Sequence, residues 1–388
     1  MAFHHLPLLL KPRIDFVTDT LHELLQHEHQ DVVFQTARLV SIIGDSLQKV
    51  DELPPLARRV SMWEKLSSPL CSVLQAHHSS AAKVVACDCI ANIGEQCFKE
   101  LPDVCFVSDC GENILRALTE TALVVRTKAA WALANLSDAL VLNMDDPELE
   151  RIDDDLLLRL LEVSVQCADD NDKVKMNATR ALGNMLRLIR EDNLSKRSQM
   201  KPLCEVAISK LVECASKVSN MKVRWNACYA IGNAMKNNTL FTSFSGWQSQ
   251  VFSNLCSLSQ ECKNLKVRIN AAVALRAPQT RAHFDVHFCL VWRGVMEAMQ
   301  NAANVDDFSE YKHKDHLIEQ VRLRHLFLLG SLFVYPIVCI HSQFVCYFVI
   351  YEERFVSALR DISPRVLPSP ANGPSGHFRP VDIQFRMR

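Results

Sequence analysis

A short helical segment recurs along this chain, and that recurrence limits the possible folds more than any other feature. In its clearest copy, Asn220–Met235, four residues form one apolar stripe at the spacing i, i+4, i+7 and i+8. They are Val223, Ala227, Ala230 and Ile231. Because most of these side chains are small, an element packed on the stripe must approach closely.

The copies align at two anchor positions. The valine anchors are Val125, Val174, Val223 and Val267. The alanine anchors are Ala86, Ala129, Ala178, Ala227 and Ala271, with Ala37 as a weaker sixth copy. Successive alanines are 49, 43, 49, 49 and 44 residues apart. A period in the forties with two helices per unit indicates stacked helical repeats, in which neighbouring units together bury what one unit leaves exposed.

The apolar periodicity predicts pairs of helices joined by short polar turns. First helices are predicted near residues 15–26, 63–76, 112–121, 156–167, 203–216 and 247–262. Second helices are predicted near residues 30–43, 81–94, 125–136, 174–189, 222–235 and 266–275. Further helices are expected near 286–302 and from about residue 309. Ten glycines and fifteen prolines in 388 residues agree with an all-α chain.

Several copies resemble repeats of a known kind. The stretch VRTKAAWALANLS at 125–137 resembles the second helix of an armadillo or HEAT repeat, as do KVKMNATRALGNMLR at 173–187 and KVRWNACYAIGNAMKN at 222–237. The resemblance runs to about Arg322, with an irregular connector after Arg276. It implies a right-handed α-solenoid of about six or seven HEAT/armadillo-type helix pairs over residues 12–324. It also suggests a shortened form of a larger repeat protein, and it brings no enzymatic activity with it.

The C-terminal part follows a different pattern. Leu326–Tyr351 has no Asp, Glu, Lys or Arg, which meets the criteria for a membrane-spanning helix. A proline and three polar residues inside it favour two other interpretations, a buried terminal helix pair or a tail from alternative or read-through coding sequence. Residues 325–362 are therefore a hydrophobic segment of open status. Residues 363–388, rich in Pro, Gly and Ser, are expected to be disordered.

Composition excludes several classes of protein. The formal net charge of −1 gives no bulk attraction to nucleic acid or anionic membrane. Five of the fifteen cysteines occupy positions where a helix needs a small apolar residue: Cys87, Cys89, Cys214, Cys228 and Cys256. Together with the absence of C-x-x-C and of a secretory signal, this predicts reduced thiols in a cytoplasmic or nuclear protein. The N-terminus runs almost directly into helical pattern, as in one piece of a longer array.

Helix phase predicts the surface of the second helices. Counted from the valine anchor, positions +6 and +10 fall at about 240° and 280°, away from the packed stripe at about 25°. Position +10 holds Asn135, Asn184 and Asn233, with Asn92 equivalent, and position +6 holds Trp131, Arg180 and Tyr229. The asparagines have two interpretations: a structural ladder between repeats, or amides that hold a peptide backbone as the armadillo resemblance implies. We take these six residues, without Asn92, as the candidate protein-binding site.

A basic column is expected on the other flank of the second helices. It consists of Lys83, Arg126, Lys175, Arg224 and Arg268. One interpretation is an intramolecular ladder with acidic residues such as Asp170 on the adjoining turn. The other is a grip on an acidic protein segment or a phosphate backbone. The neutral net charge favours the ladder.

No enzyme motif is present. The segment His22–His27 places its histidines five residues apart, which puts the rings on different faces of a helix and does not fit a zinc site. No phosphate-binding glycine loop and no nucleophile motif occurs. The sequence predicts a non-enzymatic scaffold with no cofactor and no metal, whose concave face binds an extended peptide or a helix of a protein partner. Two alternatives are a karyopherin-like or nucleic-acid-associated adaptor that uses the basic column, and a scaffold anchored in a membrane through 326–351.

Overall fold

The computed structural model describes residues 12–48, 54–76, 79–100, 104–144, 152–216, 220–303 and 313–323. The chain divides into two units, Met1–Ser331 and Leu332–Arg388, and all of the described residues belong to the first. In this part of the chain every regular element is a helix. The prediction of an all-α chain is confirmed.

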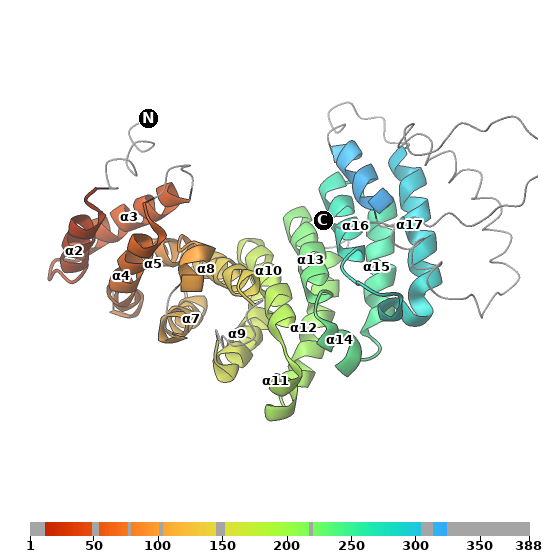
Figure 1. The fold of residues 1–388 in the computed structure, drawn as a ribbon, viewed down its shortest axis with the longest axis horizontal. Coiled ribbons are helices and arrows are strands. Elements are labelled where there is room, and N and C mark those ends of the chain that lie inside the picture. The colour runs from red at the N-terminus through yellow and green to blue at the C-terminus, as the bar shows by residue number, and fades with distance from the viewer. Residues whose placement is uncertain are drawn as a thin grey trace, which may run out of the picture. The chain divides into compact units, whose positions relative to one another are not determined.

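The helices form two layers (Figure 1). The first helices of the pairs are α2 (Ile14–Leu25), α4 (Leu56–Ala76), α7 (Val104–Leu118), α9 (Asp154–Cys167), α12 (Met200–Ala215) and α15 (Trp247–Glu261). The second helices are α3 (Gln30–Leu47), α5 (Ser80–Ala91), α8 (Leu123–Leu142), α10 (Asp172–Leu188), α13 (Met221–Ala234) and α16 (Leu265–Leu275). Each helix contacts its pair partner and the corresponding helices of the neighbouring pairs, which is the contact pattern of a solenoid.

The predicted anchors form the core between the layers. All four anchor valines are 0% exposed, and the anchor alanines, Ala37 included, are at most 1% exposed. Each second helix therefore contributes its anchor side chains to the core at the equivalent position of the repeat. The stripe that defines the repeat in sequence is the surface on which the second helices stack.

Two glycines set how closely successive second helices approach. A Cβ added at Gly183 of α10 would lie 2.4 Å from the Cα and carbonyl oxygen of Ala230 in α13. One added at Gly232 of α13 would lie 3.0 Å from the Cα of Ala274 in α16. The contact at Gly183 is too short for any side chain, and the one at Gly232 would require the neighbouring backbone to shift by a few tenths of an ångström. The two glycines thus allow the backbones of α10, α13 and α16 to approach closely.

Asparagine side chains start three of the second helices. Asn171, Asn220 and Asn264 are the N-caps of α10, α13 and α16, and their side-chain oxygens accept hydrogen bonds from Lys173 N, Lys222 N and Val267 N. An N-cap asparagine satisfies one of the amide groups that a helix leaves unpaired at its start. Each cap belongs to the same sequence motif, which gives the three helices a common register.

Three pairs are followed by a short third helix that the periodicity did not predict. These helices are α6 (Glu95–Glu100), α11 (Glu191–Lys196) and α14 (Asn238–Ser243). Six residues are too few to show an apolar period. For this reason the sequence pattern predicts polar turns where these short helices lie. The irregular connector after Arg276 contains a 3₁₀ helix, η2 (Arg281–His287), which leads into α17 (Phe288–Ala303). A further helical stretch covers 313–323.

The predicted core cysteines are buried. Cys87, Cys89 and Cys228 are 0% exposed, and Cys214 and Cys256 are nearly so. Burial raises the pKa of the Cys228 thiol to about 12, so this group stays protonated and packs as a small apolar side chain.

The predicted hydrophobic segment 326–351 and the predicted disordered tail lie outside the described residues. Among the helices that are described, none combines the length and the apolar character needed to cross a bilayer.

Candidate functional site on the second helices

The three residues at position +6 stand on successive second helices. Trp131 lies on α8, Arg180 on α10 and Tyr229 on α13, and these helices pack directly on one another. Tyr229 is 39% exposed, while Trp131 and Arg180 are half-buried. The Nζ of Lys128 lies 4.9 Å from the centre of the Trp131 ring. The column therefore offers aromatic and cationic groups to the surface from three consecutive repeats.

The asparagines at position +10 form hydrogen bonds between repeats. Asn233 Nδ2 donates to Asn184 Oδ1 at 2.8 Å. Asn184 Nδ2 in turn donates to Ser137 Oγ at 3.1 Å and to the Asp138 carboxylate on α8. Asn135 Nδ2 donates to the Ala91 carbonyl oxygen of α5 at 2.9 Å. The equivalent Asn92 continues this interaction by donating to the Ser41 carbonyl oxygen of α3 at 3.2 Å.

These contacts are those expected for the structural interpretation of the asparagines. Asn184 is 0% exposed and Asn233 is 4% exposed, and both use their amide groups within the protein. A contact between Asn184 and a ligand would require the ladder to open. A binding role for the asparagines stays a prediction, whereas the neighbour-to-neighbour bonds are present in the structure.

The ladder is completed by a charged pair that sequence reasoning missed. The Arg180 guanidinium donates to Asn135 Oδ1, and its Nε lies 3.3 Å from the Asp138 Oδ2. Burial raises the pKa of Asp138, and the charge of Arg180 and the hydrogen bond from Asn184 oppose that rise. The signal in sequence was Asp138 itself, one helical turn after Asn135 and hence on the same face. Arg180 is therefore held in place by protein groups before any ligand arrives.

The first two members of the basic column form the predicted intramolecular ion pairs. Lys83 pairs with Glu120, which precedes the next second helix. Arg126 binds Asp170 through two hydrogen bonds, Nε to Oδ2 at 2.6 Å and Nη2 to Oδ1 at 3.1 Å. The hydrogen bond from Arg126 is the main cause of the lowered pKa of Asp170. In this half of the column the basic residues form ion pairs with acids that precede the next second helix.

The remaining members differ from that pattern. Arg224 is 4% exposed and Arg268 is 6% exposed, and neither forms an ion pair within the described residues. Arg268 Nε donates to the Ser259 carbonyl oxygen at 2.9 Å, whereas its Nη2 and the Nε of Arg224 are buried without a hydrogen-bond partner. Lys175 is half-buried, also without an ion pair among the described residues. The predicted acid ladder thus stops after Arg126.

An aromatic side chain lies beside this second half of the column. Trp225 on α13 is half-buried, and the Nζ of Lys266 on α16 lies 5.2 Å from the centre of its ring. The cation–π contact connects Trp225 with the basic flank.

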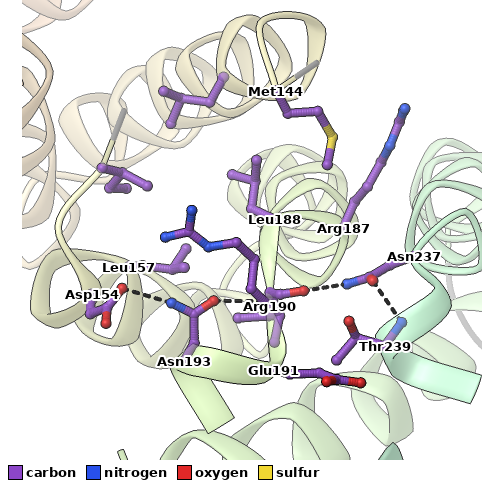
Figure 2. Close-up of a pocket in the computed structure, with 13 residues that line it drawn as sticks. Met144, Asp154, Leu157, Arg187, Leu188, Arg190, Glu191, Asn193, Asn237 and Thr239 are labelled. Atoms are coloured by element: carbon purple, nitrogen blue, oxygen red, sulfur yellow. Dashed lines mark hydrogen bonds between the residues drawn. The ribbon is translucent and has the colours of Figure 1, made fainter. Parts of the chain in front are cut away.

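A cavity of about 330 Å³ lies near the C-terminal ends of α8 and α10, beside α11 and α14 (Figure 2). Two asparagines build its walls. Asn193 donates to Asp154 Oδ1 at 2.7 Å, and Asn237 donates to the Ile189 carbonyl oxygen at 2.7 Å. The lining contains no His, Cys or Ser. Through these hydrogen bonds, Asn193 connects α11 to α9 and Asn237 connects the start of α14 to the end of α10.

No family model matches the chain. An uncharacterised protein of Dictyostelium discoideum is 23% identical over an alignment that covers 59% of this chain and 22% of that protein. The chain therefore spans about a fifth of the length of this relative.

Solved structures with a similar fold include Kap121p and Kap95. A multiple mutant of Kap121p has a TM-score of 0.55 at 14% identity, with 84% of this chain and 35% of that chain covered. Kap95 in complex with Nup1 has a TM-score of 0.53 at 11% identity, with 91% and 46% covered. Kap95p bound to RanGDP has a TM-score of 0.50 at 13% identity, with 92% and 47% covered. At these identities the likeness defines the class of fold, an α-solenoid of HEAT/armadillo type as in the karyopherins.

Proposed function

We propose that this chain is a non-enzymatic protein-interaction scaffold that binds an extended peptide, or a helix of a partner, on the face of its second helices. The observation that supports this proposal most is the column of Trp131, Arg180 and Tyr229 on three successive helices. These residue types contribute most of the binding energy in many protein interfaces. At the rim of the column the proposed contact comes from the half-buried Asn135, whereas proposed contacts from the buried Asn184 and Asn233 would require the ladder to open.

The spacing of the column suits an extended partner. Helices that pack on one another lie about 8–10 Å apart, and an extended chain advances about 3.3 Å per residue. Each step from one second helix to the next therefore corresponds to about three residues of bound peptide. The side chains of such a peptide would meet Trp131, Arg180 and Tyr229 in turn.

The ladder below the column supports the same proposal. Arg180 is fixed by Asn135 and Asp138, so its charge is positioned without loss of side-chain freedom on binding. A surface that is already ordered binds more tightly than one that must order on contact.

The sequence motifs at 173–187, 222–237 and 264–275 resemble those of HEAT repeat-containing protein 6, and we propose a relationship to that protein. We further propose that this chain acts in the cytoplasm, the nucleus or both. The similar structures with Nup1 and RanGDP are complexes with protein partners, which supports a protein partner here.

A karyopherin-like or nucleic-acid-associated adaptor is the second candidate function. The fold of Kap95 and Kap121p favours it. It would require the basic column to face solvent, yet Arg224 and Arg268 are buried and Arg126 is paired with Asp170. A scaffold anchored in a membrane would depend on 326–351, outside the described residues.

Selection from a displayed library of random peptides tests the main proposal. Peptides selected on the native chain should lose affinity by about tenfold or more for Tyr229→Ala and for Trp131→Ala, as is typical of anchor residues. Phe16→Ala is the matched control, because Phe16 is an aromatic residue on α2 with 71% exposure. Selected peptides that bind all three variants with native affinity would show that the column is not the binding site.

A further inference from the structure

The second half of the basic column lacks the acidic residue that neutralises the first half. Asp170, the partner of Arg126, directly precedes Asn171, the N-cap of the next second helix. For Arg224 the next second helix is α16, whose N-cap is Asn264. The residue directly before that cap is Lys263, so a lysine takes the position of the carboxylate. The repeat pattern thus predicts an acid where this chain has a base.

An acidic residue is also missing at the equivalent position for Lys175 on α10, which lies between α8 and α13. By the same comparison, the acidic partner of Lys175 on α10 would lie directly before Asn220, the N-cap of α13. In sequence the four residues before that cap are Ser216, Lys217, Val218 and Ser219, and none of them is acidic. For Arg268 the corresponding segment lies outside the described residues. The comparison with Arg126 and Asp170 is therefore limited to Arg224 and Lys175.

The local charge balance is strongly positive, although the whole chain is nearly neutral. From residue 214 to residue 284 the sequence contains nine lysines and arginines and one carboxylate, Glu261. Nine positive charges minus one negative charge give this segment a formal charge of +8. Lys222, Lys263 and Lys266 are exposed and have no ion pair within the described part of the chain. Such a segment attracts an acidic partner that the average charge does not reveal.

The stability of the helices does not explain these lysines. Lys222 lies in the first turn of α13, and Lys266 lies in the first turn of α16. Positive charge near a helix N-terminus opposes the helix dipole and destabilises the helix by a few tenths of a kcal/mol. The orphan Nε of the buried Arg224 is a further unfavourable feature. A carboxylate that approaches this edge from outside offsets the charge of the exposed Lys222 and Lys266, while the buried Arg224 Nε stays out of its reach.

We propose that the edge formed by the N-terminal ends of α10, α13 and α16 docks an acidic segment, rich in Asp and Glu, of a protein partner. Its carboxylates contact the exposed Lys222, Lys263 and Lys266. This inference rests on the proposed scaffold role and names the chemistry of one partner. It uses a different edge from the Tyr229 column, so either can fail without the other.

An acidic peptide fits this edge better than a nucleic acid does. Three neighbouring helices present their bases over about 20 Å, which an extended peptide covers with about six residues. Binding of single-stranded nucleic acid relies on aromatic rings free for stacking on bases. Among the described residues at this edge, the aromatic ring of Trp225 already has Lys266 over its face.

Fluorescence anisotropy with a labelled peptide of alternating Glu and Ser tests the proposal, with the Gln–Ser peptide as its uncharged counterpart. The native chain should bind the Glu peptide and not the Gln peptide. Lys263→Asp restores the acid of the repeat pattern, so it should weaken binding about tenfold while leaving the melting temperature unchanged or higher. The double variant Lys222→Glu/Lys266→Glu should weaken binding at least as much and provides a second test if Lys263→Asp does not fold.

Lys201→Asp is the matched control, because Lys201 is an exposed lysine at the far end of α12. It should change the affinity by less than about twofold, and Tyr229→Ala should leave it unchanged. Equal losses of affinity for Lys201→Asp and Lys263→Asp would show that only the net charge of the chain matters, and would overturn the proposal. So would failure of the Glu peptide to bind, or tighter binding of poly(U) with the same dependence on Lys263.

Discussion

At the scale of single residues, the asparagines of the second helices act as polar links in an otherwise apolar stack. Asn233, Asn184 and Asp138 connect α13, α10 and α8 in one chain of hydrogen bonds. Buried hydrogen bonds of this kind add modest net stability, but a buried polar group left without its partner is costly. The ladder therefore penalises any shift of one repeat against the next.

Replacing Asn184 tests the ladder. Asn184→Ala removes the acceptor of Asn233 and the donor to Ser137 and Asp138, so we expect a loss of about 1–3 kcal/mol in the free energy of unfolding. Chemical denaturation followed by circular dichroism measures this loss. Asn270→Ala is the control, since the Asn270 side chain donates to the Lys266 carbonyl of its own helix and is half-buried at the surface. Equal losses for the two variants would contradict a special role for the inter-repeat bonds.

The register of these asparagines could be predicted from the sequence, but their partners could not. Helix phase placed Asn135, Asn184 and Asn233 on one side of the second helices. Whether an amide faces solvent or the neighbouring helix depends on the rotation of one helix against the next, which a periodicity does not contain. For the same reason the pairing of Arg180 with Asp138 became visible only in three dimensions.

At the scale of elements, the closest contacts between repeats are made where glycine replaces a side chain. Gly183 of α10 faces the backbone of Ala230 in α13, and Gly232 of α13 faces Ala274 in α16. Glycine inside a helix costs about 1 kcal/mol relative to alanine in an isolated helix. The contact between helices must outweigh that cost.

Gly183→Ala should therefore destabilise the fold, although alanine is the better helix former. The new Cβ would lie 2.4 Å from the Ala230 carbonyl oxygen, and overpacking of this kind costs about 1–3 kcal/mol. Thermal unfolding of the variant measures the effect. Gly94→Ala is the control, because no atom lies within 4 Å of a Cβ at that position. A Gly183→Ala variant as stable as the native chain would show that α10 and α13 can separate without cost.

The long helices were predictable and the short ones were not. The anchor valines and alanines are spaced as helix geometry requires, and all of them are buried. Two of the six-residue helices have local polar caps instead: in α14 the Asn237 side chain accepts from Thr239 N, and in α11 the Asn193 side chain accepts from Arg190 N. A cap of this kind looks like an ordinary polar turn in sequence.

At the scale of the molecule, the charge is distributed unevenly along the array. The ion pairs of Lys83 and Arg126 neutralise the basic column in its first half, whereas Lys263 stands where an acid would pair with Arg224 in the second half. The net charge of −1 averages over both halves, so composition alone argued against an electrostatic site. The positions of the acids relative to the repeat, and not their number, decide where a partner's charge can be accepted.

Hydrogen–deuterium exchange of the chain with a peptide from the library selection tests the central claim, that partners bind the second-helix face, most directly. We predict slower exchange in α8, α10 and α13 around Trp131, Arg180 and Tyr229, with no change in the first helices α9 and α12. Protection confined to the first helices, with α8, α10 and α13 unchanged, would contradict the account.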